Sequence, residues 1–129
     1  MLLKLIHTRP LFFAVAWSIF ILILCSTPGH YIPTTNWLEL LSFDKLVHAS
    51  IFFVLVILWL IVLIKYNLIN TFSICITIAL CITYGGVLEI MQAQLFSQRS
   101  GDWLDFIANS IGCIVALIWF VKSKGRNFT

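Results

Sequence analysis

The stretch that decides the fold is Tyr84-Gly-Gly-Val-Leu-Glu-Ile-Met-Gln92, followed after a short polar connection by Arg99-Ser-Gly-Asp-Trp-Leu-Asp-Phe-Ile-Ala-Asn-Ser-Ile-Gly112. Within otherwise apolar segments it places four polar side chains, Glu89, Gln92, Asp105 and Asn109. An ionisable residue in a lipid-facing helix costs about 2.5–3.5 kcal/mol on insertion scales, so such side chains are expected to face inward and to have partners. The stretch therefore predicts a membrane protein with a polar interior.

The composition of the whole chain agrees with this prediction. Of its 129 residues, 61% are hydrophobic and only 10% are charged, whereas soluble domains carry about 25% charged residues. The apolar runs are about 15–25 residues long, which suits a hydrocarbon core of about 30 Å. Only helices satisfy their own backbone groups at that depth without closing a barrel. We therefore expect a single all-α membrane domain over residues 1–129.

The apolar runs predict a bundle of four transmembrane helices at about residues 10–26, 44–64, 70–96 and 102–121. A basic start before the first run is also typical of a signal peptide. That run is long, however, and no small-residue cleavage site follows it, so we expect it to be retained as a span. Between the first two spans, residues 35–41 fit either a short helix in the headgroup region, anchored by Trp37, or an irregular loop.

Lysine and arginine are distributed unequally between the two sides of the predicted bundle. Six of them fall on the side of the two termini, and only Lys45 and Arg99 fall on the other side. By the positive-inside rule, both termini are expected in the cytoplasm. Every acidic residue then lies in the outer half of the bilayer or outside it. No long basic run exists in the sequence, so nucleic-acid binding is not expected.

Polar residues on the last three predicted spans share helical faces and a common depth. They stand three or four residues apart, as neighbours on one helix face do: Asp44 and His48, Glu89 and Gln92, and Asp102, Asp105 and Asn109. Glu89 lies about 10 Å below the outer boundary at 1.5 Å rise per residue, a depth comparable to those of His48 and Asn109. We therefore expect a polar pocket that opens to the outer surface, with Lys45 and Arg99 at its rim. For Gln92 and Asn109, interhelical adhesion is the alternative role, worth about 0.6 kcal/mol on average.

The predicted pocket holds more acids than bases. Four carboxylates face Lys45 and Arg99, with the charge of His48 undecided, and a net excess of two negative charges is unfavourable in a low dielectric. Three solutions stay open: a buried carboxyl, first of all that of Glu89, keeps its proton; His48 is charged and pairs; or a cation is bound. A metal centre is not expected, because no second His or Cys stands at ligand spacing from His48.

Small residues predict where the helices approach one another closely. Ala108, Gly112 and Ala116 stand four apart on the fourth span, and the Gly85-Gly86 pair lies on the third. Trp103 is expected to be an aromatic anchor near the outer boundary, with a place in the wall of the ligand site as the alternative. The four cysteines are expected to be small packing residues, not a disulfide framework. No cofactor is expected.

Taken in order, Asp44-Lys45-x-x-His48, Tyr84-Gly85 with Glu89-x-x-Gln92, and Arg99-x5-Asp105-x3-Asn109-x-x-Gly112 resemble the VanZ-like family of small bacterial membrane proteins. The resemblance covers about residues 43–120 and implies a multi-pass protein of the bacterial cytoplasmic (inner) membrane. The family's namesake is an accessory protein linked to low-level resistance to the lipoglycopeptide teicoplanin. No catalytic residue assignment comes with the family. Two residues depart from its pattern, since Phe52 stands where Tyr is common and Gln98 where Gly or Pro is common.

The first functional hypothesis is a binding protein for an anionic or amphiphilic envelope molecule, such as an envelope lipid, a cell-wall precursor or a lipoglycopeptide. Lys45 and Arg99 are expected to take the anionic part. The expected ligand-binding residues are Asp44, Lys45, His48, Glu89, Gln92, Arg99, Asp105 and Asn109.

Two other functions stay open. One is an intramembrane hydrolase or transferase for a lipid-linked substrate, with Glu89 or Asp105 as general base and His48 assisting. No G-x-S-x-G or H-E-x-x-H signature supports it. The other is a proton- or ion-coupled conduit, for which four spans without inverted repeats are too few unless the chain forms a homo-oligomer.

Overall fold

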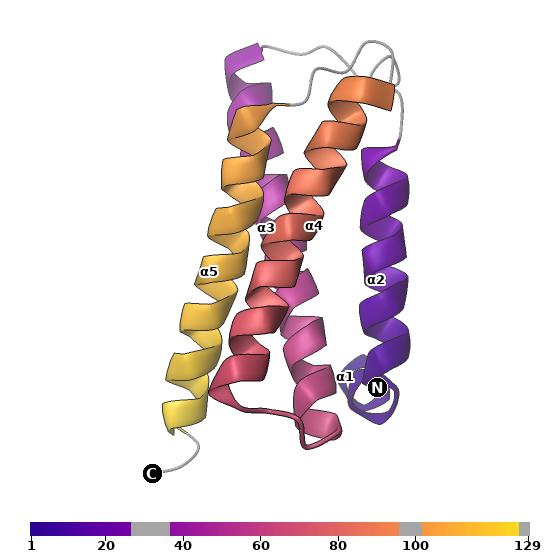
Figure 1. The fold of residues 1–129 in the computed structure, drawn as a ribbon, viewed down its shortest axis with the longest axis vertical. Coiled ribbons are helices and arrows are strands. Elements are labelled where there is room, and N and C mark those ends of the chain that lie inside the picture. Colours follow the sequence, from indigo (N-terminus) through magenta and orange to yellow (C-terminus); the bar gives the residue numbers. More distant parts are fainter. Residues whose placement is uncertain (27–36, 96–101, 127–129) are drawn as a thin grey trace.

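The long apolar runs of the sequence all fold as α-helices. The structure, a computed structural model, describes residues 1–26, 37–95 and 102–126. Over these residues the helices are α1 (Leu2–Thr8), α2 (Pro10–Cys25), α3 (Trp37–Lys65), α4 (Thr71–Leu95) and α5 (Trp103–Arg126). The four longer helices run alternately up and down along one axis (Figure 1). The all-α prediction is therefore confirmed.

The lengths and surfaces of these helices are those of a membrane protein. Among the described residues, three segments are long and apolar enough to cross a bilayer, namely Phe43–Lys65, Thr71–Leu95 and Trp103–Ser123. The apolar helix α2 has 16 residues and a length of about 24 Å, shorter than a hydrocarbon core of about 30 Å. Large apolar side chains such as Phe12, Leu80 and Trp119 are exposed on the outside of the bundle. Such a surface suits lipid better than water.

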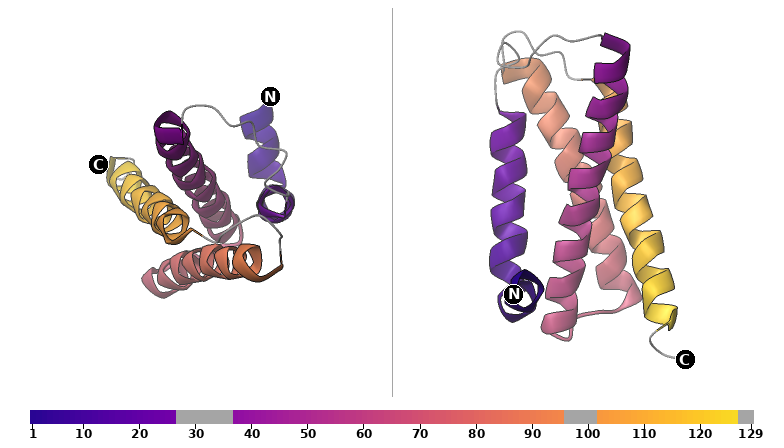
Figure 2. Two further views of the ribbon diagram at one scale, coloured as in Figure 1. Left: turned by 90° about the horizontal axis from the view of Figure 1, so that it is seen from above. Right: turned by 180° about the vertical axis from the view of Figure 1, so that it is seen from behind.

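The N-terminal ends of two helices differ from the prediction. Pro10 begins α2, because its fixed φ angle favours the first helical position, and the preceding Arg9 breaks the helix with φ −130° and ψ 56°. The short helix α1 before it was not predicted, and it lies across the end of α2 (Figure 2). Helix α3 begins at Trp37, since no Pro or Gly interrupts residues 37–65. Residues 37–41 are thus the first turns of a long helix, neither a separate headgroup helix nor a loop.

A short turn after Lys65 reverses the chain and starts α4. Asn67 adopts the left-handed conformation with φ 55°, which asparagine tolerates better than most residues do. Asn70 and Ser73 then cap the next helix reciprocally. The Ser73 N–H donates to the Asn70 side-chain oxygen at 2.9 Å, and the Asn70 N–H donates to the Ser73 hydroxyl oxygen at 3.0 Å. These local bonds place α4 antiparallel to α3.

Helix α3 packs against α2, α4 and α5 and forms the centre of the bundle (Figure 2). It approaches α5 closely at Gly112, where an added Cβ would meet the backbone of Ala49. Ala108 and Ala116 on the same stripe are buried as well. On α4, a Cβ at Gly85 would lie 3.1 Å from the ring of Phe52. The predicted close packing through small residues is therefore confirmed.

The two ends of the bundle differ in chemistry. We call one the polar end; it is formed by the end of α2 at Cys25, the start of α3, the end of α4 at Leu95 and the start of α5 at Trp103 (Figure 1). The opposite end holds α1, the turn after Lys65 and the last turns of α5. Both described ends of the chain thus lie at the same end of the bundle.

Candidate functional site

Charged side chains of α3 and α5 meet at the polar end. The Lys45 ammonium donates to Asp102 Oδ2 at 2.6 Å and to Asp105 Oδ1, and it lies 3.7 Å from Asp44 Oδ2. Asp102 caps the start of α5, because its Oδ1 accepts the Leu104 N–H at 2.9 Å, and Asp105 lies in the first turn. Carboxylates are favourable at a helix N-terminus, where backbone N–H groups point outward. The capping position and the first turn of α5 therefore bring the carboxylates of Asp102 and Asp105 to the Lys45 ammonium.

His48 lies one turn deeper, between the same two helices. Its Nδ1 is 3.1 Å from Asn109 Oδ1, a carbonyl oxygen that can only accept, so Nδ1 carries the hydrogen and donates. Its Nε2 lies 3.8 Å from Asp44 Oδ1 and 3.8 Å from Asp105 Oδ2. His48 is only 6% exposed and Asn109 is fully enclosed. We call Asp44, Lys45, His48, Asp102, Asp105 and Asn109 together the α3–α5 polar cluster.

A cavity of about 370 Å³ opens between α4 and α5 beside this cluster. Its walls are Gly86, Glu89, Ile90, Ala93, Asp102, Trp103 and Phe106. Glu89 is buried, whereas Trp103 is 72% exposed, with its ring centroid 5.7 Å from that of Phe106. Asp102 belongs to both the cavity and the cluster. The cavity is therefore mostly apolar, with two carboxylates on its walls and an aromatic side chain that faces outward.

Most of the predicted site residues are brought together, but in two groups. Asp44, Lys45, His48, Asp105 and Asn109 form the polar cluster, as their helical intervals predicted, while Glu89 lines the adjacent cavity. The alternative role of Trp103, in the wall of a cavity, matches the geometry. Arg99 and Gln98 lie outside the described residues.

Gln92 takes its alternative role of interhelical adhesion, and the position of Lys45 differs from the expectation. Gln92 is buried, and its Nε2 donates to the carbonyl oxygen of Cys25 at 3.0 Å, so it joins α4 to α2 and does not face the cluster. Lys45 is not a free cation at a rim, because its ammonium is already matched by carboxylates. Asp102, which was expected on the same helix face as Asp105 and Asn109, belongs to both the cluster and the cavity. The sequence indicated this position, because Asp102 stands three residues before Asp105 and so shares its helix face.

The surroundings of Asp102 predict a specific dependence on pH. The hydrogen bond from Lys45, and then that from the Leu104 N–H, lower the pKa of Asp102 below its ordinary value of 3.8. A carboxyl with a lowered pKa stabilises the folded state above its ordinary pKa, and this stabilisation is lost as the pH falls through the folded-state pKa. We expect the melting temperature in detergent to fall as the pH is lowered below about 4, and to fall less in Asp102→Asn.

The matched control for this measurement is Asp44→Asn. It removes a carboxylate that is 45% exposed and 3.7 Å from the Lys45 ammonium, while the hydrogen bonds of Asp102 stay in place. Equal acid dependence in the wild type and in Asp102→Asn would contradict the assignment.

Comparisons with known proteins add no relative from which a role could be transferred. No protein-family model matches the chain, and no curated protein and no solved structure shows significant similarity to it. The resemblance to the VanZ-like family therefore stays a prediction that rests on the residues of the sequence itself.

Proposed function

We propose that the chain is a VanZ-like protein of a bacterial cytoplasmic membrane, and that the cavity between α4 and α5 binds the polar head of an amphiphilic envelope molecule. Such a molecule is an envelope lipid, a lipid-linked cell-wall precursor or a lipoglycopeptide. In this proposal α2 is the fourth span, both termini are cytoplasmic and the polar end faces outward. The distribution of lysine and arginine supports this orientation. The end opposite the polar end holds Lys4, Arg9, Lys65 and Lys122.

The observation that carries the proposal is the chemistry of the α4–α5 cavity. Its volume of about 370 Å³ lies in the range of about 300–1,000 Å³ that small-molecule sites occupy. Apolar walls with a few convergent polar groups are typical of such sites. Here Glu89 and Asp102 are the polar groups, and exposed Trp103 offers an amphipathic surface at headgroup level. A molecule with a polar head and an apolar body matches both parts.

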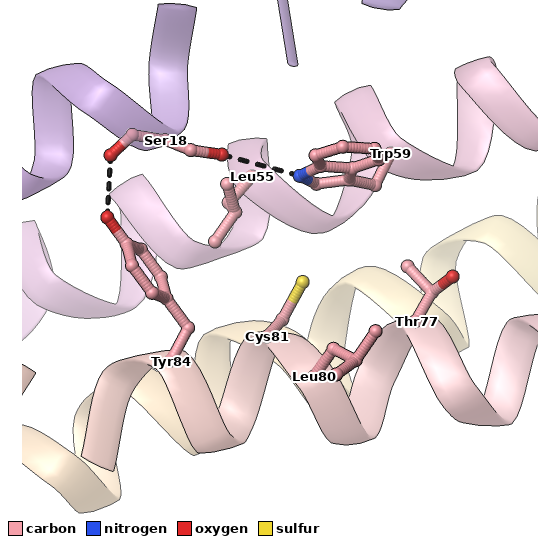
Figure 3. Close-up of a pocket in the computed structure, with 7 residues that line it drawn as sticks. All are labelled: Ser18, Leu55, Trp59, Thr77, Leu80, Cys81 and Tyr84. Carbon is pink, nitrogen blue, oxygen red and sulfur yellow. Dashed lines mark hydrogen bonds between the residues drawn. The ribbon is translucent and has the colours of Figure 1, made fainter. Parts of the chain in front are cut away.

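A second cavity, of about 240 Å³, gives further support because it suits a hydrocarbon chain (Figure 3). It lies between α2, α3 and α4, and its lining is Ser18, Leu55, Trp59, Thr77, Leu80, Cys81 and Tyr84. The Tyr84 hydroxyl donates to the Ser18 carbonyl oxygen at 2.6 Å, and the Trp59 indole N–H donates to the Ser18 hydroxyl at 3.4 Å. With these donors satisfied, mainly apolar surface remains. An apolar cavity of about 150 Å³ already holds benzene, so this one can hold part of an acyl chain.

The hydrolase or transferase hypothesis keeps one specific observation in its favour. His48 is held by Asn109 and faces the carboxylates of Asp44 and Asp105, the kind of arrangement in which an imidazole acts as general base. Turnover of a labelled lipid-linked substrate that is lost in Glu89→Gln or His48→Gln would establish this alternative.

Filling the α4–α5 cavity is expected to abolish binding of the amphiphile. Ala93 lines this cavity and is exposed, so Ala93→Trp places an indole in the cavity without disturbing the core. We expect binding of fluorescently labelled teicoplanin to the purified protein in nanodiscs to weaken about tenfold or more, the equivalent of about 1.4 kcal/mol. Fluorescence anisotropy measures this change.

The matched control is Ala79→Trp, the same substitution at an exposed position of α4 that lines neither cavity. It is expected to bind like the wild type. Leu80→Trp, which fills the cavity of Figure 3, tests whether the acyl chain occupies that space. Equal binding by Ala93→Trp and Ala79→Trp would contradict the proposed site, as would a loss confined to Leu80→Trp.

A further inference from the structure

Three side chains of the α3–α5 polar cluster present ligand atoms to one point. One ligand atom each of Asp44, His48 and Asp105 lies within 4.8 Å of the other two. His48 Nε2 is 3.8 Å from each carboxylate oxygen, so an ion equidistant from the nitrogen and one oxygen lies at least 1.9 Å from both. For the largest separation of 4.8 Å that the three ligand atoms have, the same lower limit is half of it, 2.4 Å. Bonds from Zn²⁺ to imidazole nitrogen and carboxylate oxygen are about 2.0–2.2 Å long. The three atoms are therefore close to ligand spacing, and binding of a small divalent cation would draw the two carboxylates slightly inward.

The hydrogen bond between His48 and Asn109 orients the imidazole so that its other nitrogen, Nε2, is available to bind a metal ion. Because Nδ1 donates its hydrogen to Asn109 Oδ1, the neutral ring keeps an unshared electron pair on Nε2. Metal-binding histidines are typically oriented in this way by a partner on their other nitrogen. Among the described residues, Nε2 meets only the two carboxylate oxygens, and 3.8 Å is too long for a hydrogen bond. The imidazole of the buried His48 residue thus faces two carboxylates without a hydrogen bond to either.

Lys45 occupies a different part of the cluster from the point that these three atoms face. It takes Asp105 Oδ1 and lies near Asp44 Oδ2, whereas His48 faces Asp105 Oδ2 and Asp44 Oδ1. Each carboxylate thus divides its oxygens between the ammonium and the imidazole. The cluster has three carboxylates, with Asp102 as the third, against one ammonium. Its excess of two negative charges equals the charge of one divalent cation.

We propose that Asp44, His48 and Asp105 bind a divalent transition-metal ion of the Zn²⁺ or Mn²⁺ class. An imidazole nitrogen suits these ions, whereas Mg²⁺ and Ca²⁺ prefer ligand sets made of oxygen alone. Three protein ligands leave at least one coordination position open to water or to an anionic group. The sequence-based expectation of no metal considered His and Cys at chain spacing only, and this ligand set is assembled across two helices. The site extends beyond the proposed binding of an amphiphile and stands without it, since none of the three ligands lines the α4–α5 cavity.

Metal binding is tested on the purified full-length protein in detergent after treatment with EDTA. A Cys75→Ser background removes the exposed thiol, which could bind Zn²⁺ by itself. Isothermal titration with ZnCl₂, MnCl₂ and MgCl₂ is expected to show one Zn²⁺ or Mn²⁺ per chain, bound at least tenfold more tightly than Mg²⁺. Substitution with Co²⁺ is expected to give the visible absorption of a nitrogen–oxygen site.

Three variants separate coordination from general attraction to negative charge. Asp44→Asn and His48→Gln are expected to weaken Zn²⁺ binding at least tenfold. Asp102→Asn, which removes an equal charge from the cluster but no ligand, is expected to stay within about threefold of the wild type. Circular dichroism checks that each variant folds, and half-exposed Asp44 makes Asp44→Asn informative even if His48→Gln does not fold. The proposal is overturned if the wild type shows no saturable one-to-one binding, or if Asp102→Asn loses as much affinity as Asp44→Asn.

Discussion

Gly112→Ala is expected to destabilise the folded bundle by about 3 kcal/mol, although it adds a single methyl group. The new Cβ would overlap the carbonyl oxygen of Ala49 and would lie 2.9 Å from its carbonyl carbon and 3.0 Å from its Cα. These are backbone atoms of α3, which cannot rotate away as a side chain can, so α3 and α5 must separate. Overpacking costs about 1–3 kcal/mol, and contact with backbone places this case at the upper end of that range.

Gly86→Ala is the matched control for this effect. Its Cβ would meet the ring of Phe106 at 3.2 Å, and that ring can shift by a few tenths of an ångström. We expect a loss below about 1 kcal/mol for Gly86→Ala. The free energy of unfolding, measured by titrating the protein in mixed micelles with a denaturing detergent, compares the two variants. Similar losses of unfolding free energy in the two variants would contradict the close contact between the backbones of α5 and α3 at Gly112.

Much of this fold could be predicted from the sequence, because a lipid environment leaves few alternatives. The apolar runs predicted the bodies of α2 to α5, since a helix is the structure that satisfies its own backbone groups within a bilayer. The ends were predicted less well. The apolar residues of α1 and of the first turns of α3 form runs too short to mark a span, so the sequence left α1 unpredicted and did not join residues 37–41 to the long helix that follows them. The stripe around Gly112 predicted a close approach but could not identify Ala49 as its partner, because helix pairing is a tertiary property.

For the candidate site too, spacing along one helix could be predicted from the sequence, whereas contacts between helices could not. Intervals of three and four residues predicted which side chains share a face, and His48 and Asn109 do meet at one depth. Gln92 takes the alternative role of interhelical adhesion, and its partner is a backbone atom that no spacing of polar residues identifies. The Cys25 carbonyl belongs to the last turn of α2, where carbonyl oxygens have no partner within the helix. The position of Lys45 between two carboxylates of α5 depends on the packing of α3 against α5, which no spacing along the chain encodes.

Lys45→Met is expected to have the second large effect on stability, because it leaves the carboxylates of α5 without their ammonium. Removing one partner of a fully buried ion pair costs about 3–5 kcal/mol. The side chains of Lys45 and Asp105 are 21% and 12% exposed, so water offsets part of this penalty. We therefore expect a loss of about 2–3 kcal/mol in the free energy of unfolding at pH 7. Lys65→Met, at an exposed position on the opposite end, is expected to change it by less than about 0.5 kcal/mol.

The double variant Lys45→Met/Asp105→Asn determines whether the loss comes from an uncompensated charge or from lost packing. Replacing both members of a buried ion pair by neutral side chains of similar size is often close to neutral. If the unpaired Asp105 carboxylate causes the instability, the double variant is expected to regain about half of the loss or more, since Asp102 is partly exposed and tolerates water better. A double variant no more stable than Lys45→Met would instead show that the aliphatic part of Lys45 supports the contact between α3 and α5. The ion pair would then be a consequence of that packing and not its cause.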